Sequence, residues 1–159
     1  MSGNGRSRRE VLKAAGVVAG GAGLARLTIC PAGATPATMQ DAVRDFVGEA
    51  TVTKGKVKLD LPPLVENGNS VPCVVSVESP MTSADYVKAI HIFNEKNPQP
   101  YVISVRLGLR SGRAAFATRI RLADSQTVTA IAELSDGTFW SDTADVIVTL
   151  AACIEDTSH

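Results

Sequence analysis

Hydrophobic and polar residues alternate with a period of two over most of the chain beyond residue 56. Such alternation is typical of β-strands that bury one face. It recurs at 57–61, 71–77, 101–107, 116–122, 128–134 and 146–150, and the stretch 86–93 is apolar on both faces, like a central strand. Turn residues separate these stretches, and Ser135-Asp136-Gly137-Thr138 favours a two-residue hairpin. Because no helical stretch intervenes, we predict an all-β fold over 38–150: an immunoglobulin-like antiparallel β-sandwich of about seven strands.

A short N-terminal helix is expected to precede the sandwich, over residues 38–48. Its apolar residues fall on a single helical stripe, at Met39, Ala42, Val43, Phe46 and Val47. Thr38 and Asp41 resemble a capping box, and Gly48 can end the helix. The stripe predicts that the helix packs on the body or on a partner.

Residues 1–34 read as a targeting segment rather than as part of the fold. Arg8 and Arg9 stand in the run Arg-Ser-Arg-Arg-Glu-Val-Leu-Lys, which resembles a twin-arginine export signal. The uncharged stretch 14–25 would rise about 18 Å as a helix, too short for a bilayer core of roughly 30 Å. Small residues place cleavage near 34–37, and the bulky Ile29 before Cys30 argues against lipidation. An amphipathic helix is the alternative. We expect export to the periplasm, with no membrane association after cleavage.

Charge and composition exclude several classes of function. Sixteen basic residues balance sixteen acidic ones, but the first 34 residues hold five basic residues and one acidic residue, so the remainder carries a net charge of −4. A mildly acidic body argues against non-specific binding of nucleic acid or anionic membrane. Two histidines and three cysteines are too few and too scattered for a zinc framework. We expect no cofactor.

Two cysteines remain after the targeting segment, and their contexts differ. Residues 151–159 form a short tail that holds Cys153. Chain ends without packing partners are mobile, so its thiolate could enter the active sites of partners; alternatively Cys153 is a small hydrophobic residue that continues the strand. Cys73 shares the parity of Val71 and Val75, which predicts a buried structural role. A Cys73–Cys153 disulfide is the main rival interpretation.

Other polar residues are weaker candidates for a site. His91 lies in the doubly apolar stretch without a second ligand nearby, so a hydrogen-bonded structural role is favoured over a metal or catalytic one. Five arginines occur within sixteen residues, at Arg106, Arg110, Arg113, Arg119 and Arg121. They predict a solvated strand face and loop, or otherwise a surface that holds sulfonate-like anions or an acidic partner.

The order of several short motifs resembles the SoxY family, the sulfur-carrier subunits of bacterial thiosulfate oxidation. The motifs are Leu61-Pro62-Pro63-Leu64-Val65-Glu66-Asn67-Gly68, Val77-Glu78-Ser79-Pro80-Met81, Ile90-His91-Ile92-Phe93 with Asn97-Pro98, Thr118-Arg119-Ile120-Arg121-Leu122-Ala123 and Ser135-Asp136-Gly137-Thr138-Phe139-Trp140. The resemblance implies an immunoglobulin-like fold, twin-arginine export and a complex with a SoxZ-like subunit. It also implies a sulfur intermediate held covalently on a cysteine of a C-terminal swinging arm, which corresponds to Cys153.

The arm itself departs from the family pattern Gly-Gly-Cys-Gly-Gly. Here it reads Ala151-Ala152-Cys153-Ile154-Glu155, similar to a SoxY-related group named for that motif. Alanine and isoleucine restrict and widen the arm. Glu155 and Asp156 place negative charge beside the thiol, which should raise its pKa and repel an anion such as thiosulfate.

The sequence therefore predicts a periplasmic carrier that is not itself an enzyme. Partner enzymes would load and unload Cys153, and a SoxZ-like subunit would complete a heterodimer. One alternative is an exported, non-catalytic β-sandwich interaction module whose cysteine is structural. Another is a redox protein that uses a Cys73–Cys153 pair.

Overall fold

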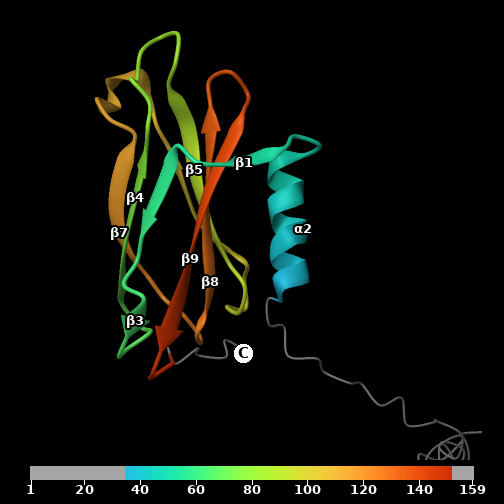
Figure 1. Cartoon of the computed structure of the whole chain (residues 1–159), viewed down its shortest axis with the longest axis vertical. Coiled ribbons are helices and arrows are strands. Elements are labelled where there is room, and N and C mark those ends of the chain that lie inside the picture. The colour runs from blue at the N-terminus through green and yellow to red at the C-terminus, as the bar shows by residue number, and fades with distance from the viewer. Residues whose placement is uncertain (1–34, 152–159) are drawn as a thin grey trace, which may run out of the picture. The chain divides into compact units, whose positions relative to one another are not determined.

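The computed structural model describes residues 35–151, in which two β-sheets pack face to face beside one α-helix (Figure 1). The large sheet has the strand order β1-β9-β8-β5-β6, with β3 also paired to β9, and the small sheet has the order β2-β4-β7. The elements are α2 (Pro36–Val47), β1 (Val52–Lys54), β2 (Val57–Asp60), β3 (Leu64–Val65), β4 (Val71–Val77), β5 (Val87–Asn94), β6 (Tyr101–Arg106), the 3-10 turn η1 (Leu109–Ser111), β7 (Ala115–Ile120), β8 (Gln126–Leu134) and β9 (Phe139–Val148). The predicted β-sandwich is confirmed. Within this range no helix combines the length and apolar character needed to cross a membrane.

Alternation in the sequence becomes alternation in burial. Along β4 the side chains of Val71, Cys73 and Val75 are wholly buried between the sheets, whereas Val74 faces outward. Burying one such aliphatic side chain stabilises the fold by about 1.5–3 kcal/mol. The predicted hairpin does join β8 to β9, but its loop has three residues rather than two. The Leu134 amide donates to the Thr138 carbonyl oxygen (3.0 Å), and the Gly137 amide donates to the Leu134 carbonyl oxygen (3.1 Å). Gly137 takes up the extra residue with a φ of +81°.

The segment from β1 to β3 accounts for the difference between the predicted strand number and the nine strands observed in the described range. It follows one edge of β9, pairing with it in parallel at β1 and again at β3. Between these pairings the chain crosses to the small sheet as β2, after a sharp bend at Gly55 (φ +120°) and Lys56 (φ +52°). The Leu59 amide donates to Asp142 Oδ2 on β9 (2.9 Å), which fixes the crossing. The expectation of purely antiparallel sheets was wrong at this edge.

Helix α2 begins at Pro36, two residues earlier than predicted. Its N-cap is Thr35, whose hydroxyl accepts a hydrogen bond from the Thr38 amide (3.2 Å), while Thr38 Oγ1 accepts one from the Thr35 amide (2.6 Å). The predicted Thr38–Asp41 box is therefore wrong, because a threonine followed by proline at the first helical position forms the cap one turn earlier. Gly48 follows the helix with φ +62°, as predicted.

The apolar stripe of α2 packs on the body, on the outer face of the large sheet. Phe46 lies on His91 of β5, with ring centroids 3.7 Å apart, and meets the edge of Phe139 at 5.6 Å. Phe93, wholly buried, lies beneath the same ring at 6.3 Å. Since this cluster faces away from the space between the two sheets, the helix forms a third layer.

Candidate functional site

The end of β9 is fixed to the segment that carries β3. Four backbone hydrogen bonds join them: Ile147 N to Pro63 O (2.9 Å), Thr149 N to Val65 O (3.0 Å), Leu150 N to Glu66 O (3.1 Å) and Gly68 N to Leu150 O (2.9 Å). We call residues 63–68 and 147–150 the arm root. The described chain ends one residue later at Ala151, which is exposed.

The predicted arm, residues 151–159, follows the arm root directly in the sequence. Ala151 is its one described residue, and Ala152, Cys153, Ile154 and Glu155 lie outside the described range. So do the predicted export-signal residues, Arg8 and Arg9. Cys153 follows Leu150 by three residues, so covalent geometry alone places its Cα within about 11 Å of the Leu150 Cα.

Cys73 occupies the core position that its parity predicted. It is a free thiol with no exposed surface, and its Cα partner across the small sheet is Thr118. Burial, together with the smaller effect of the nearby Asp60 carboxylate, raises the pKa of Cys73 to about 11. A disulfide needs Cα atoms about 4.4–6.8 Å apart, so an arm cysteine would have to enter the sandwich to reach it.

We expect Cys73 to resist alkylation in the folded chain. With a pKa of about 11, roughly one Cys73 in a thousand is a thiolate at pH 8. Iodoacetamide at pH 8 should therefore modify the peptide that contains Cys153 and leave the Cys73 peptide unmodified until the chain is unfolded in guanidinium. Equal labelling of both peptides under native conditions would contradict this assignment.

His91 is held between the large sheet and the helix, as a structural histidine would be. It is 8% exposed, its Nδ1 lies 3.4 Å from the Tyr101 hydroxyl, and Phe46 covers its ring. Desolvation lowers its pKa below the ordinary 6.5, while the Glu133 carboxylate opposes that shift and Arg106 adds to it. The environment thus favours the neutral ring.

This arrangement predicts that acid weakens the folded state. The lowered pKa means that the unfolded chain binds a proton at His91 more readily, so the stabilisation present above pH 6.5 is lost as the pH falls below it. One such group changes the free energy of unfolding by at most about 1.4 kcal/mol per pH unit. Urea titrations between pH 7.5 and 5 should show a smaller pH dependence for His91→Gln than for the unchanged chain. Parallel curves for the two proteins would overturn the role assigned to His91.

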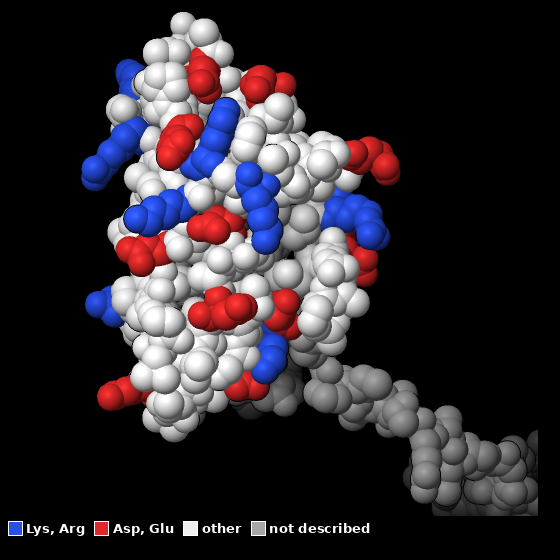
Figure 2. Space-filling view, viewed as in Figure 1, with Lys and Arg blue, Asp and Glu red and all other residues white. Residues whose placement is uncertain are grey.

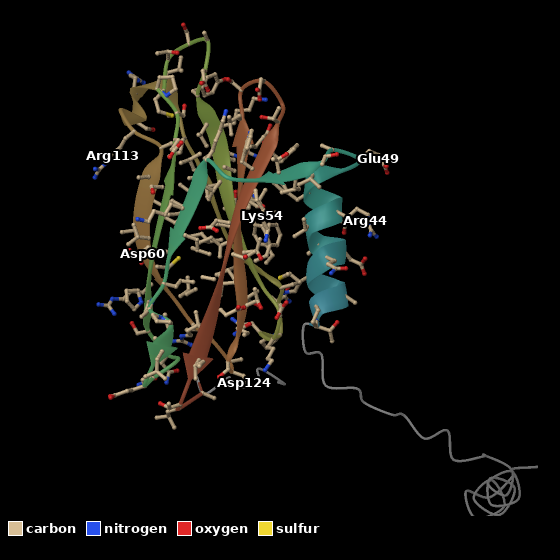
Figure 3. The ribbon with its side chains drawn as sticks, viewed as in Figure 1. Arg44, Glu49, Lys54, Asp60, Arg113 and Asp124 are labelled. Atoms are coloured by element: carbon tan, nitrogen blue, oxygen red, sulfur yellow. The ribbon has the colours of Figure 1, made fainter. Side chains whose placement is uncertain are left out.

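The five arginines do not form one site. All five are exposed; they lie on β6, in and after η1, on β7 and just after it. Arg119 Nη1 donates to Ser70 O (3.4 Å) and contacts Ser70 Oγ (3.3 Å), while Arg113 points away from the body (Figure 3). On the face shown in Figure 2, basic and acidic side chains are interspersed rather than gathered. These positions agree with a solvated strand face and loop.

A cleft of about 380 Å³ lies beside α2 and is lined by Phe46, Lys88, His91, Arg106 and Glu133 among others. Within it Lys88 Nζ and Glu133 Oε1 form an ion pair at 3.2 Å. Over residues 35–151 no three His, Cys, Asp or Glu side chains are grouped so that they could hold a metal ion.

Sequence reasoning missed the apolar surface of the arm root. Leu64 and Ile147 are register partners, and each is 57% exposed. A signal was present, because Ile147 has the same parity as Thr143, Asp145 and Thr149, which are polar. An isoleucine at a position where the alternation otherwise has polar residues indicates exposed apolar surface outside the core.

Two solved structures of known proteins have a fold similar to that of this chain. The structure of the sulfur carrier protein SoxY from Chlorobium limicola f thiosulfatophilum is similar with a TM-score of 0.60 and 23% sequence identity, covering 72% of this chain and 98% of that chain. A superoxide reductase (neelaredoxin) from Ignicoccus hospitalis has a TM-score of 0.53 and 16% identity, over 72% of this chain and 94% of its own. At these identities both likenesses show the fold alone. No curated protein matches the sequence.

Comparison with protein-family models identifies the family of the chain. The family described as "Sulfur oxidation protein SoxY" matches residues 43–153, which is more than half of the chain. The match covers the C-terminal part of α2 and all nine described strands, and it ends at Cys153. The chain therefore belongs to the SoxY family of sulfur oxidation proteins.

Proposed function

We propose that this protein is a periplasmic carrier that holds sulfur intermediates covalently on Cys153 during sulfur oxidation. The observation that carries the proposal is the arm root: backbone hydrogen bonds anchor the chain through Leu150, and the family match continues for three residues, to Cys153. The similar fold of a solved SoxY sulfur carrier supports it. The body would present the sulfur, and partner enzymes would perform the chemistry.

The chemistry requires a thiol that partners can reach. In disulfide-type exchange the Cys153 thiolate attacks a sulfur atom of the donor, a new S–S bond forms, and the other donor sulfur leaves as a thiolate, so no external oxidant is consumed. In oxidative conjugation the Cys153 sulfur and a thiolate-level sulfur of the donor form an S–S bond, while the thiol proton is released and two electrons pass to an acceptor on the loading enzyme. Cys73 is unsuited to either reaction because it is buried and protonated.

The composition of the arm bears on which sulfur species is carried. Glu155 and Asp156 follow Cys153 closely and disfavour both the thiolate and an anionic donor. Ala152 and Ile154 replace the glycines that would let an arm pass through a narrow cleft. We propose that the loading enzyme has a wider or more basic entrance than one suited to a glycine arm, and that thiosulfate is not the sole donor.

Partner-free strand edges favour a heterodimer with a SoxZ-like subunit. Within the described range β6 ends the large sheet, and β2 and β7 end the small sheet. Exposed edges of this kind are usually covered or blunted. Co-expression with a SoxZ-like neighbour should shift the chain to a 1:1 complex in size-exclusion chromatography. A well-behaved monomer that ignores every such neighbour would remove the partner from the proposal.

The carrier function is tested by the mass of the protein from its native host. After growth on a reduced sulfur compound, the peptide that contains Cys153 should carry an added mass that dithiothreitol removes. The Cys73 peptide from the same sample is the internal control and should be unmodified. An unmodified Cys153 thiol throughout sulfur-oxidising growth would contradict the proposal and favour the interaction module.

A further inference from the structure

Exposed apolar side chains gather at the arm root. The described range has six large hydrophobic side chains that are strongly exposed, and three of them are Leu64 (57%), Ile147 (57%) and Leu150 (63%). The other three lie apart from one another on β4, β6 and η1. We call Leu64, Ile147 and Leu150 the arm-root patch. At the lower end of the molecule in Figure 2, where β3 and the tip of β9 lie in Figure 1, an uncharged area has acidic side chains beside it.

The patch is held rigidly. Leu64 and Ile147 are Cα partners on parallel strands, and Leu150 is fixed through both its amide and its carbonyl group to Glu66 and Gly68. The Thr149 hydroxyl adds a bond to Glu66 O (3.2 Å). A preformed apolar surface loses little conformational entropy on binding, which is the usual property of a docking face.

The length of the arm decides what covers this surface. Cys153 lies at most about 11 Å from Leu150, so an active site that acts on its sulfur must bring its entrance to the arm-root patch. The patch is bordered by exposed carboxylates, at Glu66 and at Asp145 on the same face of β9 as Ile147. Glu155 and Asp156 of the arm sequence carry the same sign.

We infer that the arm-root patch is the docking face for the enzyme that acts on Cys153, and that this enzyme surrounds its entrance with apolar side chains and lysine or arginine. The inference rests on the proposed carrier function and adds the partner's contact surface to it. Docking next to the tether positions the thiol at the entrance and makes the reaction effectively intramolecular.

The test separates docking from the reactivity of the thiol. The full chain is compared as wild type, as the double variant Leu64→Ser/Ile147→Thr, and as the control Leu109→Ser, which alters a similarly exposed leucine (47%) on η1. Each is produced in the native host during sulfur-oxidising growth, and the initial rate of adduct formation on the Cys153 peptide is measured. Alkylation by iodoacetamide measures the thiol without an enzyme.

We expect the double variant to form the adduct about tenfold more slowly, the change produced by about 1.4 kcal/mol of lost binding free energy. Its alkylation rate should equal that of the wild type, and Leu109→Ser should match the wild type in both assays. Adduct formation at the wild-type rate in the double variant would overturn the docking face and leave the carrier function intact. Absence of an adduct on the wild-type chain would overturn both.

A second copy of the chain is the other occupant that the test must address. Sedimentation of the wild type and the double variant reports self-association. Equal, concentration-independent sedimentation supports the docking face for an enzyme. A wild-type dimer that the double variant loses would overturn the inference, because the patch would then join copies of the chain.

Discussion

Replacement of Cys153 by serine should abolish sulfur oxidation that depends on this protein. A serine hydroxyl is not a thiolate at physiological pH and cannot form the S–S bond that holds a sulfur intermediate. The fold should not change, because the substitution leaves intact the backbone hydrogen bonds that fix the end of β9 through Leu150. In a host that lacks the native gene, the variant should oxidise the sulfur substrate at the rate of the empty vector, while the wild type restores oxidation.

Two controls show whether a loss of oxidation is due to the missing Cys153 thiol. Cys73→Ala removes the other cysteine of the body and should retain oxidation, with lower stability because it leaves a small cavity in the core. Cys153→Ser should still bind the SoxZ-like subunit in size-exclusion chromatography. Oxidation at the wild-type rate by Cys153→Ser would identify the protein as an interaction module rather than a carrier.

Truncation of Phe93 to alanine should produce the largest loss of stability among single substitutions on the outer face of the large sheet. Phe93 is wholly buried, and its ring lies 5.6 Å from Tyr101 and 6.3 Å from Phe46 of α2. Phe→Ala substitutions in cores cost about 3–5 kcal/mol, a large part of the 5–15 kcal/mol that is usual for a domain. Urea unfolding followed by circular dichroism measures the difference.

The matched control is Leu109→Ala, which shortens an exposed leucine and should change the free energy of unfolding by less than about 0.5 kcal/mol. If Phe93→Ala costs less than about 1 kcal/mol, α2 does not cover this face of the sheet in solution. The same result would remove the physical basis for the pH dependence assigned to His91, since the two rings share the cover supplied by Phe46.

The sequence predicted those parts of the fold in which the apolar and polar pattern repeats over several residues. Alternation marked the long strands, and the parity of Cys73 placed it in the core, because burial of one sheet face imposes a period of two. β1 and β3 were missed since strands of three and two residues are too short to show a period. Their parallel pairing with β9 depends on the bend at Gly55 and on Asp142, a contact across 83 positions of sequence.

In the candidate site, too, local features are visible in the sequence, whereas features that depend on strand pairing are not. Cys153 stands out in the sequence as a local feature after the last predicted strand, but it lies outside the described residues, so its role as an arm cysteine stays a prediction. For the arm-root patch the parity of Ile147 was a signal, but its contact with Leu64 could not be predicted, since only the pairing of β3 with β9 brings the two side by side. The helix cap was misplaced by three residues because Thr35 and Thr38 are both competent caps, and Pro36 decides between them.

The most direct test of the carrier function is a pulse and chase with an isotopically labelled sulfur compound in the native host. The label should enter the peptide that contains Cys153 during the pulse, be released from it by dithiothreitol, and leave it during the chase as oxidised product accumulates. A Cys153 peptide that never acquires the label, or that keeps it unchanged throughout the chase, would contradict a carrier role for this protein.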